Sequence, residues 1–388
     1  MRKVEFGEIA TFSQGQQVSI PDQKTEKFDG CDTFLRIVNY TQNSDDFRYI
    51  PKQSHKHHVS TNDIIMVRYG AVGFVGRGLS GVLANNMFKI NFDKDQVDGN
   101  YLFRTLWSDF VQKQLLNASQ STSMAAINFK TTSKITIPLP PLDQQKKIAS
   151  ILDAAYAYKQ KTKALIEKYD QLTQSLFLDM FGDPVTNPKG WEIKMLSEVS
   201  SITTKGSSPK WQGYDYISEG VRFVTSENVR LGYLDISKDK FIAKEFHDKL
   251  KRSQLKLNDL LVNLVGASIG RGALVSRESL PANINQAVAR TELDHSKVNP
   301  LFILQQIITP QVQDRLIGNK VEGARANISL KNVREVKLYI PPLELQNQFA
   351  ERVQAIEAQK AQTQASLAQA EDLFNSLLQR AFKGELTS

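Results

Sequence analysis

A segment of about forty residues that contains neither glycine nor proline constrains the fold of this chain most. It follows Pro140 and Pro141 and ends before Gly182. Within it, a seam of mostly apolar residues recurs at alternating steps of four and three, which is typical of a helix that lies against a partner helix. The seam consists of Ile148, Leu152, Ala155, Lys159, Thr162, Ile166, Tyr169, Thr173, Leu176 and Met180. At about 1.5 Å per residue the helix would span roughly 60 Å, which is too long for one compact core.

The same segment occurs again 201 residues later, since Pro341 and Pro342 correspond to Pro140 and Pro141. Fourteen positions are identical in the two copies, and the alignment needs no gap. The second seam consists of Phe349, Val353, Ile356, Lys360, Thr363, Leu367, Ala370, Phe374, Leu377 and Ala381. Two alanine-rich helices that were alike by accident would not share the prolines and the register as well. We therefore predict an internal repeat.

The segments before the two helices also repeat one another. Asn62-Asp63 and Asn258-Asp259 each precede an apolar strand, and glycine-rich loops follow at Gly70 and Gly266. Strands are predicted at 34–38, 64–69 and 87–92, and one helix is predicted at 101–116. The predicted fold is therefore α+β, with two similar globular domains (1–139 and 182–339) and two long helical segments (140–181 and 340–388) in an internal pseudo-twofold repeat. Between the shared motifs the two domains differ widely. This is the pattern of two recognition modules with different targets, or of duplication followed by drift.

The composition favours a soluble protein of a reducing compartment. The 388 residues carry a net charge of +8, which is compatible with nucleic acid but does not establish it. Cys31 is the only cysteine, so no disulfide within the chain and no cysteine-rich zinc site is possible. We expect no signal peptide and no membrane helix, because no apolar run is long enough. The expected location is the cytoplasm.

The sequence lacks the usual signatures of catalysis. It contains neither a phosphate-binding Gly-x-x-x-x-Gly-Lys-Ser/Thr loop nor a dinucleotide-binding glycine motif. His55, His57 and His58 form the only histidine cluster, and the polar residues around it favour a solvated loop over a metal site. We predict a non-catalytic chain without a metal or a cofactor of its own.

The two helix openings and the glycine motifs resemble the specificity subunit of type I restriction–modification systems. The helices open with Pro-Leu-Pro-Pro-Leu-Asp-Gln-Gln at 138–145 and Ile-Pro-Pro-Leu-Glu-Leu-Gln at 340–346. The glycine motifs read Asn-Asp-Ile-Ile-Met-Val-Arg-Tyr-Gly-Ala at 62–71 and Asn-Asp-Leu-Leu-Val-Asn-Leu-Val-Gly-Ala at 258–267. The Asn-Gln pair that commonly follows in this family is present as Asn285-Gln286. In the first half of the chain the corresponding residues are Asn85-Asn86, so the second residue of the pair differs from the family pattern.

The resemblance implies two target-recognition domains that each read one half of a split, asymmetric site in double-stranded DNA. It implies that the two helices pair antiparallel as a coiled coil and set the spacing between the domains. It also implies two modification subunits, which carry S-adenosylmethionine and methylate adenine. Two restriction subunits that use ATP and Mg²⁺ would complete the assembly.

Candidate DNA contacts are the basic, amide and aromatic side chains of the shared motifs, because arginine and lysine suit guanine and phosphate while asparagine and glutamine suit adenine. In the first domain they are Arg36, Asn39, Tyr40, Arg68, Tyr69, Asn85, Asn86 and Lys130. In the second they are Lys205, Lys210, Trp211, Arg222, Asn228, Arg230, Asn263, Arg271, Asn285, Gln286, Arg325 and Lys331. Taken alone, an arginine or asparagine near a strand end is more often a solvated or turn-capping residue than a base reader.

Four residues outside the seams are predicted to leave apolar surface for the modification subunits. They are Tyr156, Tyr158, Leu165 and Leu378, and packing against the chain's own domains is the alternative for each. For the whole chain, the alternative is a duplicated coiled-coil scaffold that binds proteins and reads no DNA. A fused methyltransferase is disfavoured, because the repeat uses up the length of the chain and no cofactor motif is present.

Overall fold

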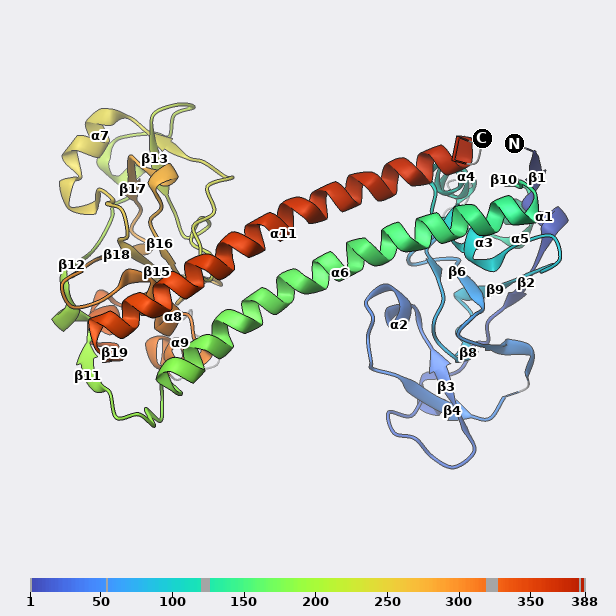
Figure 1. Ribbon diagram of the computed structural model, residues 1–388, viewed down its shortest axis with the longest axis horizontal. Coiled ribbons are helices and arrows are strands. Elements are labelled where there is room, and N and C mark those ends of the chain that lie inside the picture. The colour runs from blue at the N-terminus through green and yellow to red at the C-terminus, as the bar shows by residue number, and fades with distance from the viewer. Residues whose placement is uncertain (1, 54, 120–125, 319–326, 384, 387–388) are drawn as a thin grey trace. The chain divides into compact units, whose positions relative to one another are not determined.

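The computed structural model describes residues 2–53, 55–119, 126–318, 327–383 and 385–386. The chain divides into two compact units, which are residues 1–164 with 363–388, and residues 165–362. Unit 1 contains the first globular domain, the beginning of helix α6 (Leu142–Phe181) and the end of helix α11 (Leu343–Lys383). Unit 2 contains the second globular domain and the remaining halves of the two helices (Figure 1).

The first domain is built on two four-stranded sheets. One has the order β2-β9-β6-β7 and the other β4-β3-β8-β5, and strands β1 and β10 form a separate antiparallel pair. The strands are β1 (Lys3–Glu5), β2 (Ala10–Gln14), β3 (Cys31–Leu35), β4 (Arg48–Pro51), β5 (His58–Val59), β6 (Ile64–Val67), β7 (Val75–Gly76), β8 (Gly81–Leu83), β9 (Met87–Phe92) and β10 (Thr136–Pro138). The helical elements are α1 (Phe6–Ile9), η1 (Ile20–Asp22), α2 (Ile37–Thr41), η2 (His55–His57), α3 (Gly99–Leu106), α4 (Asp109–Ser119) and α5 (Phe129–Ser133).

The second domain repeats this topology. Its sheets have the orders β12-β18-β15-β16 and β14-β13-β17, and β11 pairs with β19 as β1 pairs with β10. The strands are β11 (Glu192–Met195), β12 (Ser200–Lys205), β13 (Val221–Val224), β14 (Phe241–Ile242), β15 (Leu260–Asn263), β16 (Gly272–Leu274), β17 (Ala282–Ile284), β18 (Val288–Leu293) and β19 (Lys337–Ile340). The helical elements are η3 (Leu196–Val199), η4 (Lys210–Gln212), α7 (Lys244–Lys249), η5 (Lys251–Ser253), η6 (Arg277–Ser279), α8 (Pro300–Ile307), α9 (Pro310–Ile317) and α10 (Leu330–Glu335). The predicted α+β class and the internal repeat are confirmed.

Two local predictions are wrong, and both fail at a polar cap. The strand predicted at 34–38 ends at Leu35, and α2 begins at Ile37, because the side-chain oxygen of Asn39 accepts a hydrogen bond from the Arg36 N–H (2.8 Å). The single helix predicted at 101–116 is two helices, α3 and α4. They separate at Ser108, whose hydroxyl donates to the Thr105 carbonyl and starts a new turn.

The two long helices pair antiparallel. In unit 1 the beginning of α6 packs on the end of α11 through Ile148, Leu152 and Phe374. In unit 2 the end of α6 packs on the beginning of α11 through Phe177 and Phe349. All the predicted seam positions are buried or half-buried. The heptad prediction is therefore confirmed within each unit, whereas the domain boundaries drawn from the sequence stay predictions.

A buried glutamine fastens each globular domain to the opening of its helix. Gln145 accepts a hydrogen bond from the Asp98 N–H (2.8 Å) and donates to the carbonyls of Gln96 and Pro140 (both 2.9 Å). Gln346 accepts from the Asn299 N–H (2.9 Å) and donates to the Pro341 carbonyl (2.7 Å). The repeated Pro-Pro-Leu-x-x-Gln pattern therefore encodes a joint between domain and helix.

The first domain has an additional ionic attachment to α6. Arg104 on α3 is almost fully buried and pairs with Asp153 of α6 (2.7 Å). Its guanidinium also lies over the rings of Trp107 (4.7 Å) and Tyr156 (4.2 Å). The corresponding residues of the second repeat are Gln305 and Gln354. There an aromatic cluster of Phe177, Phe181, Phe302, Tyr339 and Phe349 fills the junction instead.

No described helix is both long and apolar enough to cross a membrane.

Candidate nucleic-acid interface

In the first domain, polar side chains meet at the corner where β2 ends and the β8–β9 turn begins. Asn85, in that turn, donates from its amide to the side-chain oxygen of Gln17 (3.3 Å) and accepts from the Tyr69 hydroxyl (3.3 Å). Its carbonyl accepts from the Gln14 side chain (3.2 Å). The strand end, the turn and the glycine loop after β6 are thus held together by one asparagine. We call this the first-domain corner.

A recess of about 300 Å³ opens at the first-domain corner. Its apolar lining comes from Phe34, Ile37 and neighbouring aliphatic groups, and its polar lining from Gln17, Gln23, Arg36, Asn85 and Asn86. Three of the polar residues, Arg36, Asn85 and Asn86, are predicted DNA contacts. Gln17 and Gln23 were missed, although the Gln16-Gln17 pair directly after Gly15 is a detectable polar signal. Amide and guanidinium groups at a surface recess suit the edge of a base pair.

Two buried polar atoms in this recess have no hydrogen-bond partner among the described residues. They are the Nε of Arg36 and the Oδ1 of Asn86. The other end of the Arg36 guanidinium is fixed by Asp46 (2.9 Å), which also pairs with Arg48. The hydrogen bond from Arg36 holds the pKa of Asp46 below its ordinary value. Arg36 is therefore held in place by Asp46, and its Nε is a buried donor beside the recess.

The second domain forms the equivalent corner. Gly206, just after β12, donates its N–H to the Asn285 carbonyl (3.1 Å), and the Asn285 side chain caps Ala287 N–H (3.0 Å). The Oε1 of Gln286 is buried without a partner among the described residues, as is the Oδ1 of Asn86 in the first domain. Lys205 ends β12, and Lys210 with Trp211 lies on η4 a few residues further on. We call this the second-domain corner.

The two corners differ in their arginines. Thr225 occupies the place of Arg36, because Asn228 caps its N–H as Asn39 caps that of Arg36. The nearby Arg222 donates to Asp239 (2.8 and 3.0 Å) and to the Glu278 carbonyl (2.9 Å). The hydrogen bonds that Arg222 donates to Asp239 raise the pKa of Arg222. Arg230 pairs with Asp235 in the same way (3.2 Å). In this structure Arg222 and Arg230 hold loops of the second domain, as Arg36 holds the loop of Asp46 in the first.

Three predicted asparagines lie inside the domains. Asn39 and Asn228 are equivalent caps, which accept from the backbone N–H of Arg36 (2.8 Å) and Thr225 (2.9 Å). Asn263 is fully buried and donates to the carbonyls of Ser226 and Val229. The neighbouring Tyr40 is also buried, which raises the pKa of its hydroxyl. The structure gives these four side chains intramolecular surroundings.

The remaining predicted DNA contacts lie at or beyond the glycine loops. Arg68 donates to the Ile127 carbonyl (3.3 Å) and lies over the Phe129 ring. Arg271 is half-buried, and Lys130 and Lys331 are exposed on α5 and α10. Arg325 lies outside the described residues. No observation tests these residues as DNA contacts, and they stay predictions.

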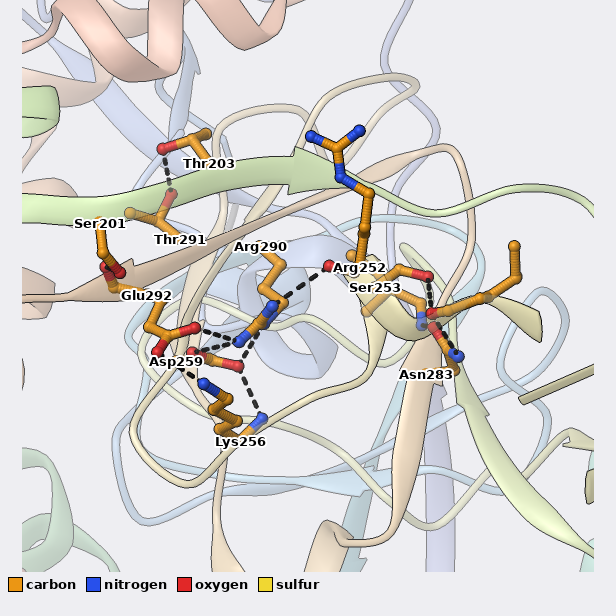
Figure 2. Close-up of polar contacts among 12 residues, drawn as sticks. Ser201, Thr203, Arg252, Ser253, Lys256, Asp259, Asn283, Arg290, Thr291 and Glu292 are labelled. Atoms are coloured by element: carbon orange, nitrogen blue, oxygen red, sulfur yellow. Dashed lines mark hydrogen bonds and ion pairs between the residues drawn. The ribbon is translucent and has the colours of Figure 1, made fainter. Parts of the chain in front are cut away.

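A cluster of ionic side chains lies around β18 and the start of β15 in the second domain (Figure 2). Arg290 on β18 and Asp259 before β15 are both only 2% exposed and form a two-point ion pair. Arg290 also contacts Glu292 (2.8 Å) and the Arg252 carbonyl (3.2 Å), and Lys256 N–H caps Asp259 (2.6 Å). The first domain has the simpler pair Lys89–Asp63 (2.9 Å) at the equivalent place.

The predicted docking residues separate into two groups. The prediction of an outward face is wrong for Tyr156 and Leu378, because Tyr156 is covered by Arg104 and Trp107, and Leu378 is buried between the helices. Tyr158 and Leu165 are exposed. Along α6 they belong to a series of exposed apolar residues spaced by seven, which are Ile151, Tyr158, Leu165 and Leu172.

The histidine cluster makes ordinary polar contacts. His57 Nδ1 lies 3.0 Å from the Gln14 carbonyl, and His58 pairs with Asp32 (3.0 Å). Within the part of the chain that the structure describes, no three His, Cys, Asp or Glu side chains are grouped so that they could hold a metal ion.

Comparison with known proteins identifies the family. The model of the type I restriction modification DNA specificity domain matches residues 1–168 and again 188–372. The chain belongs to this family. The specificity subunit of the type I restriction enzyme EcoBI from Escherichia coli is 27% identical over 334 residues, which cover 79% of this chain and 70% of that protein. The MjaVIII specificity subunit of Methanocaldococcus jannaschii is 24% identical over 376 residues, which cover 91% and 85%.

Solved structures show the same fold. A chain from a study of complex assembly and conformational transition in a type I R-M system has a TM-score of 0.59 at 17% identity, over 99% of this chain and 98% of that one. The S subunit from M. genitalium has a TM-score of 0.57 at 15% identity, over 98% and 96%. The type I specificity family predicted from the sequence is thus confirmed, and the DNA-specificity function is supported over the protein scaffold. Specificity subunits are generally non-catalytic, and membership implies DNA binding and association with other subunits of the system.

Proposed function

We propose that each globular domain of this type I specificity chain reads one half of a bipartite, asymmetric site in duplex DNA. The observation that carries the proposal is the duplicated corner. The same strand end, turn and glycine loop meet in both domains, and the side chains placed there differ. A shared scaffold with different side chains at one place is what two readers of different base sequences require.

The first-domain corner supplies both kinds of group that base reading needs. The guanidinium of Arg36 suits an acceptor such as guanine N7 or O6, and the amide of Asn86 suits adenine or cytosine, once a side-chain rotation exposes the atoms that are buried in this structure. The second-domain corner keeps the buried acceptor, Gln286 Oε1, has Thr225 in the place of Arg36, and has Lys205 and Lys210 nearby in the sequence. The two half-sites are therefore expected to differ in sequence.

The paired helices α6 and α11 set the distance between the two half-sites in this proposal. Forty and forty-one residues correspond to about 60 Å at about 1.5 Å per residue. That length caps the separation at about 18 base pairs, and half-sites on one face of the duplex lie about 10 base pairs apart, centre to centre.

Catalysis belongs to partner subunits in this proposal. Two modification subunits carry S-adenosylmethionine and methylate adenine, and two restriction subunits use ATP with Mg²⁺. The exposed residues Tyr158 and Leu165 of α6 are the docking positions for a modification subunit. Their apolar surface, repeated every seventh residue, suits a further helix packed beside α6.

Methylation mapping tests the proposal. The chain is co-expressed with its modification subunit in a host that lacks other adenine methylation, and methylated positions are read across the genome. The expected result is one bipartite motif with a fixed spacer. Inserting one heptad into both helices should lengthen the spacer by about three base pairs, since seven residues add about 10.5 Å. A continuous motif, or an unchanged spacer in an active insertion variant, would contradict the proposal.

A further inference from the structure

The two most exposed large apolar side chains of the described residues occupy matching places in the two repeats. Ile20 is 83% exposed and Trp211 is 77% exposed, ahead of Tyr233 at 60%. Ile20 begins η1, the turn that follows β2, and Trp211 is the middle residue of η4, the turn that follows β12. Single exposed apolar residues are common on protein surfaces. An exposed apolar side chain at the same place in two domains of different sequence suggests a shared function for that position.

Each turn holds its apolar side chain in a fixed position. In η1 the Ser19 hydroxyl donates to Asp22 (2.6 Å), and the Gln23 N–H donates to the Ile20 carbonyl (3.1 Å). In η4 the Tyr214 N–H donates to the Pro209 carbonyl (3.0 Å), and Gly213 ends the turn with φ = 80°. These bonds cost conformational freedom. They present Ile20 and Trp211 to solvent on ordered turns.

The segment that leads to each turn begins at a glycine, Gly15 or Gly206, whose Cα lies in close contact with backbone atoms of the corner. A Cβ at Gly15 would clash with the carbonyl oxygen of Ala84, and one at Gly206 with that of Ile284. Gly15 N–H donates to Met87 (2.9 Å), and Gly206 N–H donates to Asn285 (3.1 Å). Ile20 and Trp211 each stand five residues after these glycines, and Gln23, which follows η1, lines the recess of the first-domain corner.

The surroundings of the two side chains suit nucleic acid. Lys205 and Lys210 lie close to Trp211 in the sequence of the same turn, and Lys24 donates to the Pro21 carbonyl next to Ile20 (3.0 Å). Apolar side chains placed among cations are used by DNA-binding proteins as wedges between base steps, and aromatic rings stack on bases. An apolar protein partner would not need the lysines.

We propose that Ile20 and Trp211 are paired wedges, which pack against bases of the DNA bound by their own domains and unstack one base step in each half-site. The inference rests on the proposed function, because it needs duplex DNA at both corners. Such a wedge would make binding depend on how easily the contacted base step unstacks, without a hydrogen bond to a base. Flexible pyrimidine–purine steps would be favoured at these positions.

The test uses the full-length chain and a duplex that carries its mapped methylation motif. Binding is followed by the anisotropy of a labelled duplex, and unstacking by the emission of 2-aminopurine placed in turn along each half-site. Acrylamide quenching reports the exposure of Trp211, with Trp211→Phe to subtract Trp107 and Trp191. The substitutions are Ile20→Ala and Trp211→Ala. Ile193→Ala, at a residue 57% exposed on β11, is the matched control.

With wedges, bound DNA protects Trp211 from acrylamide and raises 2-aminopurine emission at one step of each half-site. Ile20→Ala abolishes the signal in one half-site and Trp211→Ala in the other, and each weakens binding by about tenfold or more. Ile193→Ala changes nothing. If both alanine variants bind and unstack the duplex as the wild type does, and Trp211 stays accessible, the inference is overturned while the proposed function stands. If the wild type binds no duplex, the proposed function fails first.

Discussion

The buried ion pair of the second domain gives a sharp prediction about stability. Asp259→Asn keeps the shape of the side chain but removes its charge. Arg290, 2% exposed, would keep only Glu292 as a counter-ion and the Arg252 carbonyl as an acceptor. A buried guanidinium that loses its main partner is expensive, because it cannot be rehydrated without opening the domain.

The cost follows from the contacts that are lost. Two charge-assisted hydrogen bonds join Arg290 to Asp259, and each contributes about 1.5 kcal/mol, which gives about 3 kcal/mol for the pair. The equivalent pair of the first domain, Lys89–Asp63, has side chains about one quarter exposed, and Asp63→Asn should cost about 1 kcal/mol at most. In units of about 200 residues, 1 kcal/mol corresponds to about 2–4 °C. Asp259→Asn should therefore lower the melting temperature of unit 2 by about 6–12 °C.

Tryptophan fluorescence can follow the two units separately. In a Trp107→Phe background the signal comes from Trp191 and Trp211, which both belong to unit 2, and in a Trp191→Phe/Trp211→Phe background it comes from Trp107, which belongs to unit 1. Thermal unfolding of the full-length chain is then compared for the wild type, Asp259→Asn and the matched variant Asp63→Asn. The argument is refuted if Asp259→Asn shifts unit 2 by less than about 3 °C. It is also refuted if the two variants shift their own units equally.

Three further predictions concern the corners and the docking face. Because the pKa of Asp46 is held low in the fold, the ionised Asp46 contributes stability above pH about 4, and this stability is lost as the pH falls further. Acid unfolding curves should therefore show a steeper loss of stability below pH 4 in the wild type than in Asp46→Asn. Arg36→Ala should relax one base position of one half-site in methylation mapping, at about 1–3 kcal/mol of discrimination, whereas Arg222→Ala should lower the melting temperature of unit 2 before it changes any base preference. Leu165→Glu should release a co-purifying modification subunit without a change in melting temperature, and the neighbouring exposed position, as Ala164→Glu, should retain it.

The sequence predicts features that depend on spacing along the chain. The seams through Leu152 and Val353 follow from heptad periodicity, and the repeat follows from comparison of the chain with itself. Tyr156 shows where periodicity stops being informative. Tyr156 stands outside the seam, but Trp107 of the globular domain covers it. The periodicity of a helix cannot predict which side chains of a globular domain pack against that helix.

The corners depend on contacts between distant segments. Gln17 and Asn85 meet across 68 residues, so that local patterns could nominate Asn85 but not its neighbours. Asn39 and Asn228 could have been interpreted better. Each stands three residues after the position it caps, which is a recognised capping interval. The same amide that suits a base edge suits a backbone N–H, and only the three-dimensional surroundings distinguish the two uses.

The ion pair between Arg104 and Asp153 has a consequence for how such proteins acquire new specificities. A recombination event that joined a foreign first domain to this chain at Pro140 would inherit Asp153 from one parent and whatever occupies position 104 from the other. A newcomer without a cation there would leave the Asp153 carboxylate, whose side chain is about one third exposed, without its ion-pair partner. The aromatic junction of the second repeat imposes only a condition of shape. Successful exchanges should therefore be commoner among second domains than among first domains. The exception is an exchange in which the first few turns of α6 are transferred together with the incoming first domain.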